Sequence, residues 1–233
     1  MYFEDRETEK RNFILAITKS LIIIALLWIS FLINDIFALN WNDWGMAPRT
    51  AKGVWGILTM HFLHADFEHL ISNSLPMFFL GFGIFYYFSQ KGMLIVVMNL
   101  LLTGFFTWIL GRYGVHIGAS GLVYALAFFL VTISLIKMES SMLAYTLVII
   151  FLYGSLVWGF FPQLFPNKHI SWEGHLAGAI TGILLAFFYR NEGPQKKKYF
   201  EDEEEELEEG EDSNDFFSYN WEKNTIFAII NYY

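Results

Sequence analysis

A serine stands in a glycine-rich stretch immediately before a long apolar run. Ser120 belongs to the tetrapeptide GASG, and no formally charged residue occurs across positions 113–136. A serine hydroxyl becomes a strong nucleophile only when a neighbouring base takes its proton. Histidine suits that task because its ordinary pKa lies near neutrality. We therefore pair Ser120 with His175, which lies in the sequence EGHLAGAITG, as a candidate nucleophile and general base.

Two further polar residues have a spacing that suits the same chemistry. His69 and Asn73 are four residues apart, so on a helix they lie on one face. Attack on a carbonyl creates an oxyanion, which needs hydrogen-bond donors already in place. The two side chains, together with the backbone N–H of Ser120 at a helix start, could supply those donors. Tyr124 follows Ser120 by one helical turn, so its ring could flank the histidine.

Composition places these residues in a membrane protein. The 233 residues are 55% hydrophobic and only 16% charged, whereas soluble domains usually carry about 25% charged residues. Six stretches approach the ~20 apolar residues that cross a bilayer. We therefore predict an all-α, polytopic membrane protein with six transmembrane helices and no cleaved signal peptide. The predicted spans are residues 20–39, 69–88, 93–111, 117–136, 142–161 and 172–190.

The charges divide the chain into three parts and orient it. Twelve acidic residues and one lysine lie in residues 201–233, so the net charge of −8 belongs to this tail. We predict a cytoplasmic segment at 1–19, a membrane domain at 20–190 and a largely disordered cytoplasmic tail at 191–233. Eleven lysines and arginines then face the cytoplasm and four face outward, which agrees with the positive-inside rule. The localisation that follows is a bacterial-type inner membrane.

The predicted topology brings the polar residues to one depth. Spans two, four and six all begin at the outer face, and these are the starts that carry His69 with Asn73, Ser120 and His175. Polar groups at membrane depth are costly and usually mark function. Gly174, Gly178 and Gly182 recur every four residues beside the histidine, a stripe that lets helix backbones approach closely. Span six would thereby bring His175 to Ser120.

Each of these features also has a simpler interpretation. A serine near a helix start can be a cap, a membrane histidine can serve packing, and Gly-xxx-Gly is most often only an interface. His61 and His64, with His69, could suggest a metal site, but no HExxH motif or convergent acidic ligand accompanies them. We expect these two histidines to shape the outer loop. No metal, cofactor or nucleic-acid partner is expected, and the absence of cysteine removes thiolate chemistry.

Taken together, these motifs resemble the rhomboid family of intramembrane serine proteases. The resemblance covers roughly residues 20–190, and three motifs in order on spans two, four and six make it specific. The family motif G-x-S-G matches residues 118–121, with its aromatic position at Tyr124. The other matches are H-x-x-x-N at His69 and Asn73, and H-x-x-G-x-x-x-G at His175, Gly178 and Gly182.

The resemblance implies a six-helix rhomboid fold and cleavage of transmembrane segments in single-pass or other membrane proteins within the lipid bilayer. It assigns Ser120 as nucleophile and His175 as general base, with His69, Asn73 and the Gly118 loop around the oxyanion. It also implies that span five and residues 162–171 form a gate and a cap. One departure concerns the first outer loop, residues 40–68, which has no clear Trp-Arg pair.

Two other functions fit the same composition. A catalytically silent relative would bind transmembrane clients without cleaving them, and its motifs would be intact by descent. A small transporter would carry polar residues deeper toward the inner side. The inner halves of spans two, four and six are nearly all apolar, which argues against the transporter. Their sequences are MFFLGFGIFYYF, ALAFFLVTISLI and GILLAFFY.

Overall fold

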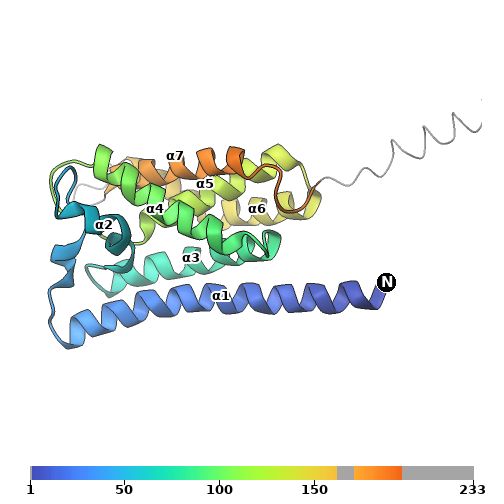
Figure 1. Cartoon of the computed structure of the whole chain (residues 1–233), viewed down its shortest axis with the longest axis horizontal. Helices are drawn as coiled ribbons and strands as arrows, with labels where there is room; N and C mark the ends of the chain where they lie inside the picture. The colour runs from blue at the N-terminus through green and yellow to red at the C-terminus, as the bar shows by residue number, and fades with distance from the viewer. Residues whose placement is uncertain (1, 162–170, 196–233) are drawn as a thin grey trace, which may run out of the picture. The chain divides into compact units, whose positions relative to one another are not determined.

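The computed structural model describes residues 2–161 and 171–195, and this part of the chain is a bundle of helices without β-strands (Figure 1). The tail predicted at residues 191–233 lies mostly outside the described residues, as does the cap predicted at 162–171. The α-helices are α1 (Tyr2–Ile36), α2 (Gly53–Thr59), α3 (Phe67–Tyr87), α4 (Gly92–Leu110), α5 (Ser120–Lys137), α6 (Ser140–Tyr153) and α7 (Trp172–Phe188). Short 3₁₀ helices are η1 (Trp41–Trp44), η2 (Met60–Phe62) and η3 (Gly154–Phe160).

The long helices correspond to the six predicted spans. Among the described residues, four helices (α1, α3, α4 and α5) are long and apolar enough to cross a bilayer, while α6 and α7 are apolar but shorter. The fifth predicted span, residues 142–161, is α-helical only to Tyr153 and continues as the 3₁₀ helix η3. A 3₁₀ helix rises about 2.0 Å per residue against 1.5 Å in an α-helix, so η3 lengthens a segment that α6 alone leaves short.

The starts of α3, α5 and α7 lie at one end of the bundle, on the left in Figure 1. The Asp66 side chain caps α3 by accepting the N–H of His69 at 2.8 Å. The segment expected to be an outer loop, residues 40–68, is more ordered than a plain loop, because α2, η1 and η2 all form within it. α2 lies so close to α4 that a side chain at Gly104 would collide with the carbonyl of Ile57.

Glycines set the distance between α5 and α7. A Cβ atom on Gly178 would collide with the carbonyl oxygen of Gly121, and one on Gly182 would collide with that of Ala125. Gly121 in turn lies opposite Gly174, whose carbonyl oxygen would be 3.1 Å from an added Cβ. The two helix backbones are therefore in direct contact along most of α7. This contact fixes the position of each helix start relative to the other.

Candidate active site

Ser120 and His175 meet where α5 and α7 begin. The Ser120 Oγ lies 3.0 Å from His175 Nε2, a hydrogen-bonding distance. Ser120 is the first residue of α5 and is half-buried, whereas His175 lies in the first turn of α7 and is buried. A serine and a histidine in hydrogen-bond contact form the unit in which the imidazole can take the hydroxyl proton.

Tyr124 covers one face of the histidine. Its ring lies 4.1 Å from the His175 ring, centroid to centroid, and the two planes differ by 8°. Phe160 of η3 meets the same tyrosine edge-on, with centroids 5.0 Å apart. Each aromatic contact of this kind restricts ring rotation. The imidazole thus packs against Tyr124 of α5, which in turn contacts Phe160 of η3.

The side chains expected around an oxyanion lie against Gly118, in the loop that leads to Ser120. Gly118 has φ +115°, a conformation that favours glycine, and an added Cβ would lie 2.6 Å from the His69 ring and 3.8 Å from Asn73 Nδ2. The Nδ2 of Asn73 is buried and has no hydrogen-bond partner within the described residues. A buried donor without a partner is costly. Here it points to the loop that precedes Ser120, where an oxyanion would use it.

The loop before Ser120 is attached to the first outer segment by its backbone. His116 and Met46 exchange two backbone hydrogen bonds of 2.8 and 2.9 Å, and the Gly118 N–H donates to the Met60 carbonyl at 2.8 Å. The N–H of Ala119 donates to His64 Nε2 at 3.4 Å. Segments far apart in sequence therefore hold the residues on which the site depends.

His61 and His64, which lie before α3, are both buried. His61 Nε2 lies 3.0 Å from the carbonyl of Leu100. Burial lowers the pKa of His61 to about 4, and burial with the neighbouring His69 lowers the pKa of His64 to about 3. A neutral His64 can accept the Ala119 N–H, as its position requires. Within the described residues, no group of three or more histidine, cysteine or acidic side chains has the arrangement of a metal site.

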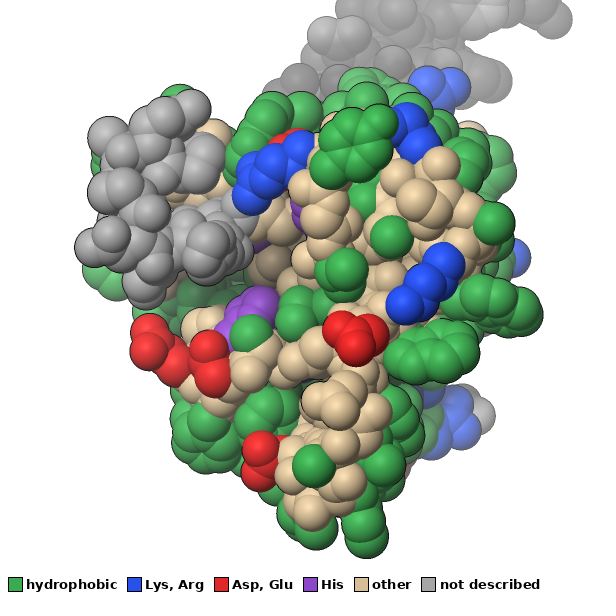
Figure 2. Space-filling view, turned by 90° about the vertical axis from the view of Figure 1, so that its left-hand side faces the viewer, with side chains coloured by type: hydrophobic (Ala, Val, Ile, Leu, Met, Phe, Trp, Pro, Cys, Tyr) green, Lys and Arg blue, Asp and Glu red, His purple; other side chains and the backbone are tan. Residues whose placement is uncertain are grey.

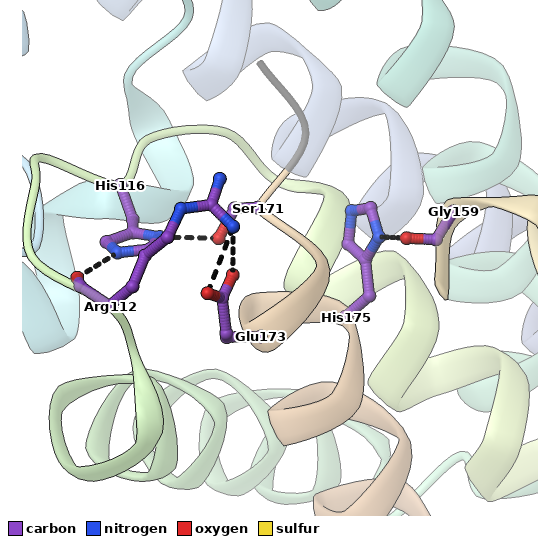
Figure 3. A network of polar contacts seen from close by, with 6 residues as sticks. All are labelled: Arg112, His116, Gly159, Ser171, Glu173 and His175. Carbon is purple, nitrogen blue, oxygen red and sulfur yellow. Dashed lines mark hydrogen bonds and ion pairs between the residues drawn. The ribbon is translucent and has the colours of Figure 1, made fainter. Parts of the chain in front are cut away.

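A second set of polar contacts joins the same loop to the start of α7 (Figure 3). Arg112 Nη1 lies 3.0 Å from both carboxylate oxygens of Glu173, whose side chain is buried. The His116 ring bridges the carbonyl of Arg112 at 2.9 Å and the hydroxyl of Ser171 at 2.6 Å. These contacts, which we call the loop–α7 clamp, tie together the two segments that carry Ser120 and His175.

Breaking the ion pair of the loop–α7 clamp should destabilise the protein. Arg112→Gln leaves the buried Glu173 carboxylate without its cationic partner, so we expect a loss of about 1–3 kcal/mol in the free energy of unfolding and reduced activity. Arg112→Gln combined with Glu173→Gln removes the buried charge as well and should recover part of both. Thermal unfolding of the three variants measures this. Wild-type stability in Arg112→Gln would show that the ion pair contributes little, and equal stability of the single and double variants would show that the unpaired carboxylate is not the cause of any loss.

The residues of the clamp carry no sequence motif that marked them in advance. Glu173 stands out only as an acidic residue at the membrane edge, where it could have oriented His175. The structure instead gives its carboxylate to Arg112, and the Nδ1 of His175 lies 2.9 Å from the carbonyl oxygen of Gly159. A backbone carbonyl belongs to every residue type, so no sequence pattern could have identified this partner.

Polar side chains are visible at the end of the bundle where Ser120 and His175 meet (Figure 2). Figure 2 views the end at which α3, α5 and α7 begin, and histidine side chains are visible there in a recess of the surface. Arginine, lysine and acidic side chains lie around this face.

Comparison with known proteins identifies the family. The model of the rhomboid domain matches residues 51–192, which is more than half of the chain. The chain belongs to the rhomboid family. It is therefore a helical integral membrane protein whose three motif-bearing helices, α3, α5 and α7, all lie inside the matched region.

The chain is also similar to individual proteins, one of which is named as a rhomboid. The rhomboid domain described here is similar to uncharacterised proteins of Mycobacterium bovis and Mycobacterium tuberculosis, each 30% identical over 196 residues, or 82% of this chain and 81% of the relative. A Bacillus subtilis protein, YdcA, named as a candidate rhomboid protease, is 28% identical over 175 residues, or 70% of this chain and 82% of the relative.

Proposed function

We propose that this rhomboid is an intramembrane serine endopeptidase that cleaves transmembrane segments of other membrane proteins with a Ser120–His175 dyad. The observation that carries the proposal is the 3.0 Å contact between Ser120 Oγ and His175 Nε2, where α5 and α7 begin. Family membership gives the reaction class, and the contact supplies the pair of groups that the reaction needs.

The reaction would proceed by acyl transfer. His175 takes the proton of Ser120 as its oxygen attacks the scissile carbonyl, which breaks the carbonyl π bond and places a negative charge on the substrate oxygen. The protonated imidazole then gives that proton to the leaving amine, and the peptide C–N bond breaks. A water molecule, deprotonated by the same histidine, hydrolyses the acyl-enzyme and regenerates the serine hydroxyl.

In the proposed reaction, hydrogen-bond donors around Gly118 and Ser120 would stabilise the oxyanion. Among the described residues the buried Asn73 Nδ2 has no hydrogen-bond partner, and the N–H of Ser120 is the first amide of α5, which an α-helix does not use internally. The His69 ring lies against Gly118, two residues before Ser120. Donors fixed before the reaction need no reorganisation when charge develops, which is why they are effective.

Asn73→Ala is expected to slow cleavage by about 10²–10³-fold, the usual cost of one lost oxyanion donor. The effect should fall on kcat, because the side chain interacts with charge that exists only in the transition state. The part of the chain that the structure describes offers its buried donor no partner, so the unfolding free energy should change little. Steady-state kinetics on a transmembrane reporter measure the split. An unchanged kcat would remove Asn73 from the oxyanion site.

The substrate class can be tested with a model transmembrane helix in reconstituted vesicles. A peptide bond inside a helix is shielded by the helix hydrogen bonds, so the substrate must unwind locally. We expect the purified protein to cleave a single-pass reporter near its outer end, and cleavage to rise when Gly or Pro is introduced there. Wild type that binds the reporter but never cleaves it would contradict the proposal and favour a silent client-binding protein.

The distribution of lysine and arginine supports a proposal for the membrane and for the orientation of the chain in it. We propose a bacterial-type inner membrane with both termini in the cytoplasm, since eleven of the fifteen lysines and arginines then lie inside. The membrane domain would be residues 20–190, between a short cytoplasmic segment at 1–19 and the acidic tail at 191–233. The site would then open toward the outer face of the membrane.

A further inference from the structure

The Nδ1 atom of His175 has a specific partner outside the family motifs. It lies 2.9 Å from the carbonyl oxygen of Gly159, a residue of η3 (Figure 3). A carbonyl oxygen can accept a hydrogen bond but cannot donate one, so Nδ1 must carry the proton. The lone pair of the neutral ring is then on Nε2, the atom that faces the Ser120 hydroxyl.

We propose that the Gly159 carbonyl is the positioning group for the base, selecting the imidazole tautomer and orientation in which His175 can accept the proton of Ser120. This inference rests on the proposed function. In soluble serine proteases a buried carboxylate does this work. The carboxylate two residues from the histidine here, that of Glu173, is bound by Arg112 instead. The Gly159 carbonyl dipole also favours the imidazolium that forms during the reaction.

Position 159 must be glycine for this contact to exist. An added Cβ would collide with the Tyr124 hydroxyl and would lie 2.9 Å from His175 Nδ1 and 3.1 Å from its Cε1. The Tyr124 hydroxyl therefore lies directly against Gly159. The backbone of this one residue therefore holds both rings of the stack that covers the dyad.

The position of η3 therefore determines whether the Gly159 carbonyl can accept the hydrogen bond from His175 Nδ1. η3 continues α6, whose described side chains include several exposed apolar ones, among them Leu147 and Phe151, the latter 88% exposed. A displacement of α6 and η3 would remove the acceptor from Nδ1 and release the tautomer. If this segment moves to admit a substrate helix, the hydrogen bond must form again before the serine is activated.

Two glycine-to-alanine variants in the same 3₁₀ helix test the proposal. Gly159→Ala should reduce kcat by about 10²-fold or more, with KM nearly unchanged. The loss should stay below the ~10⁴-fold loss of kcat that follows when the histidine of a serine protease takes the wrong tautomer. Gly154→Ala is the matched control, because an added Cβ there meets none of the described residues within 4 Å, and it should keep wild-type activity. Tyr124→Phe in the Gly159→Ala background removes one collision and should restore part of the rate. Gly159→Ala as active as Gly154→Ala would overturn the proposal.

A spectroscopic measurement keeps the proposal testable even if Gly159→Ala does not fold. The ¹⁵N spectrum of histidine-labelled protein, with His175 assigned by its loss in His175→Gln, should show a protonated Nδ1 at a pH where the ring is neutral. Because the carbonyl sets the tautomer, the same signal should persist in Ser120→Ala. A protonated Nε2 in folded, active protein would overturn the inference alone. A protonated Nδ1 in a wild type that never cleaves would overturn the proposed function and leave the hydrogen bond standing.

Discussion

Ser120→Ala is expected to abolish proteolysis while the fold stays intact. The substitution removes one oxygen atom, the one that would attack the substrate, and every helix contact remains. Loss of the serine or the histidine from a serine protease lowers kcat by about 10⁶-fold, so cleavage of a transmembrane reporter should fall below detection. His175→Ala should be equally inactive, because an unassisted hydroxyl is a weak nucleophile.

The control for this result is stability. Ser120 is half-buried and its hydroxyl is 3.0 Å from one partner, His175, so Ser120→Ala should change the free energy of unfolding by only about 1 kcal/mol. Thermal unfolding in detergent, measured beside the cleavage assay, separates lost chemistry from lost structure. A well-folded Ser120→Ala protein that still cleaves at the wild-type rate would exclude this serine as nucleophile.

Gly178→Leu is expected to destroy packing and activity together. A Cβ at Gly178 already collides with the carbonyl of Gly121 in the facing helix, so a leucine side chain must push the two backbones apart. Overpacking a core costs about 1–3 kcal/mol when side chains can adjust, and here the obstacle is backbone. The separation would also carry His175 away from Ser120.

Gly154→Leu provides the matched control for that substitution. It introduces the same side chain at a glycine whose added Cβ would meet no described residue within 4 Å, so unfolding and cleavage should stay close to those of the wild type. Helix content by circular dichroism, thermal unfolding and reporter cleavage should all separate the two variants. Wild-type stability in Gly178→Leu would show that the α5–α7 contact is not as close as its geometry indicates.

Much of this architecture could be predicted from the sequence because it depends on hydrophobicity and spacing. Uninterrupted apolar runs indicate spans, and the glycines at 174, 178 and 182 indicate a close helix contact. The i, i+4 spacing of His69 and Asn73 places them together on α3. The predicted ends of α3, α4, α5 and α7 lie within three residues of the observed ones, and caps such as Asp66 depend on local side-chain geometry. The prediction for the first span missed that α1 already begins at Tyr2, ahead of the predicted start at residue 20.

The remaining features depend on contacts that residue types do not encode. The change from α-helix to 3₁₀ helix at Gly154 occurs within a uniformly apolar segment, so hydrophobicity gives no signal for it. The ion pair between Arg112 and Glu173 joins residues 61 positions apart. The partner of His175 Nδ1 is a backbone carbonyl, and only the folded chain shows which one.

The central claim, an activated serine at position 120, is tested most directly by labelling with a fluorophosphonate probe. The purified, detergent-solubilised wild type would be treated beside Ser120→Ala and His175→Ala, and the adduct located by mass spectrometry. We predict that the probe attaches to Ser120 in the wild type and to neither variant, because the reaction needs both the hydroxyl and its base. Labelling that persists in Ser120→Ala, or a folded wild type that cleaves its reporter yet never reacts at Ser120, would contradict the account.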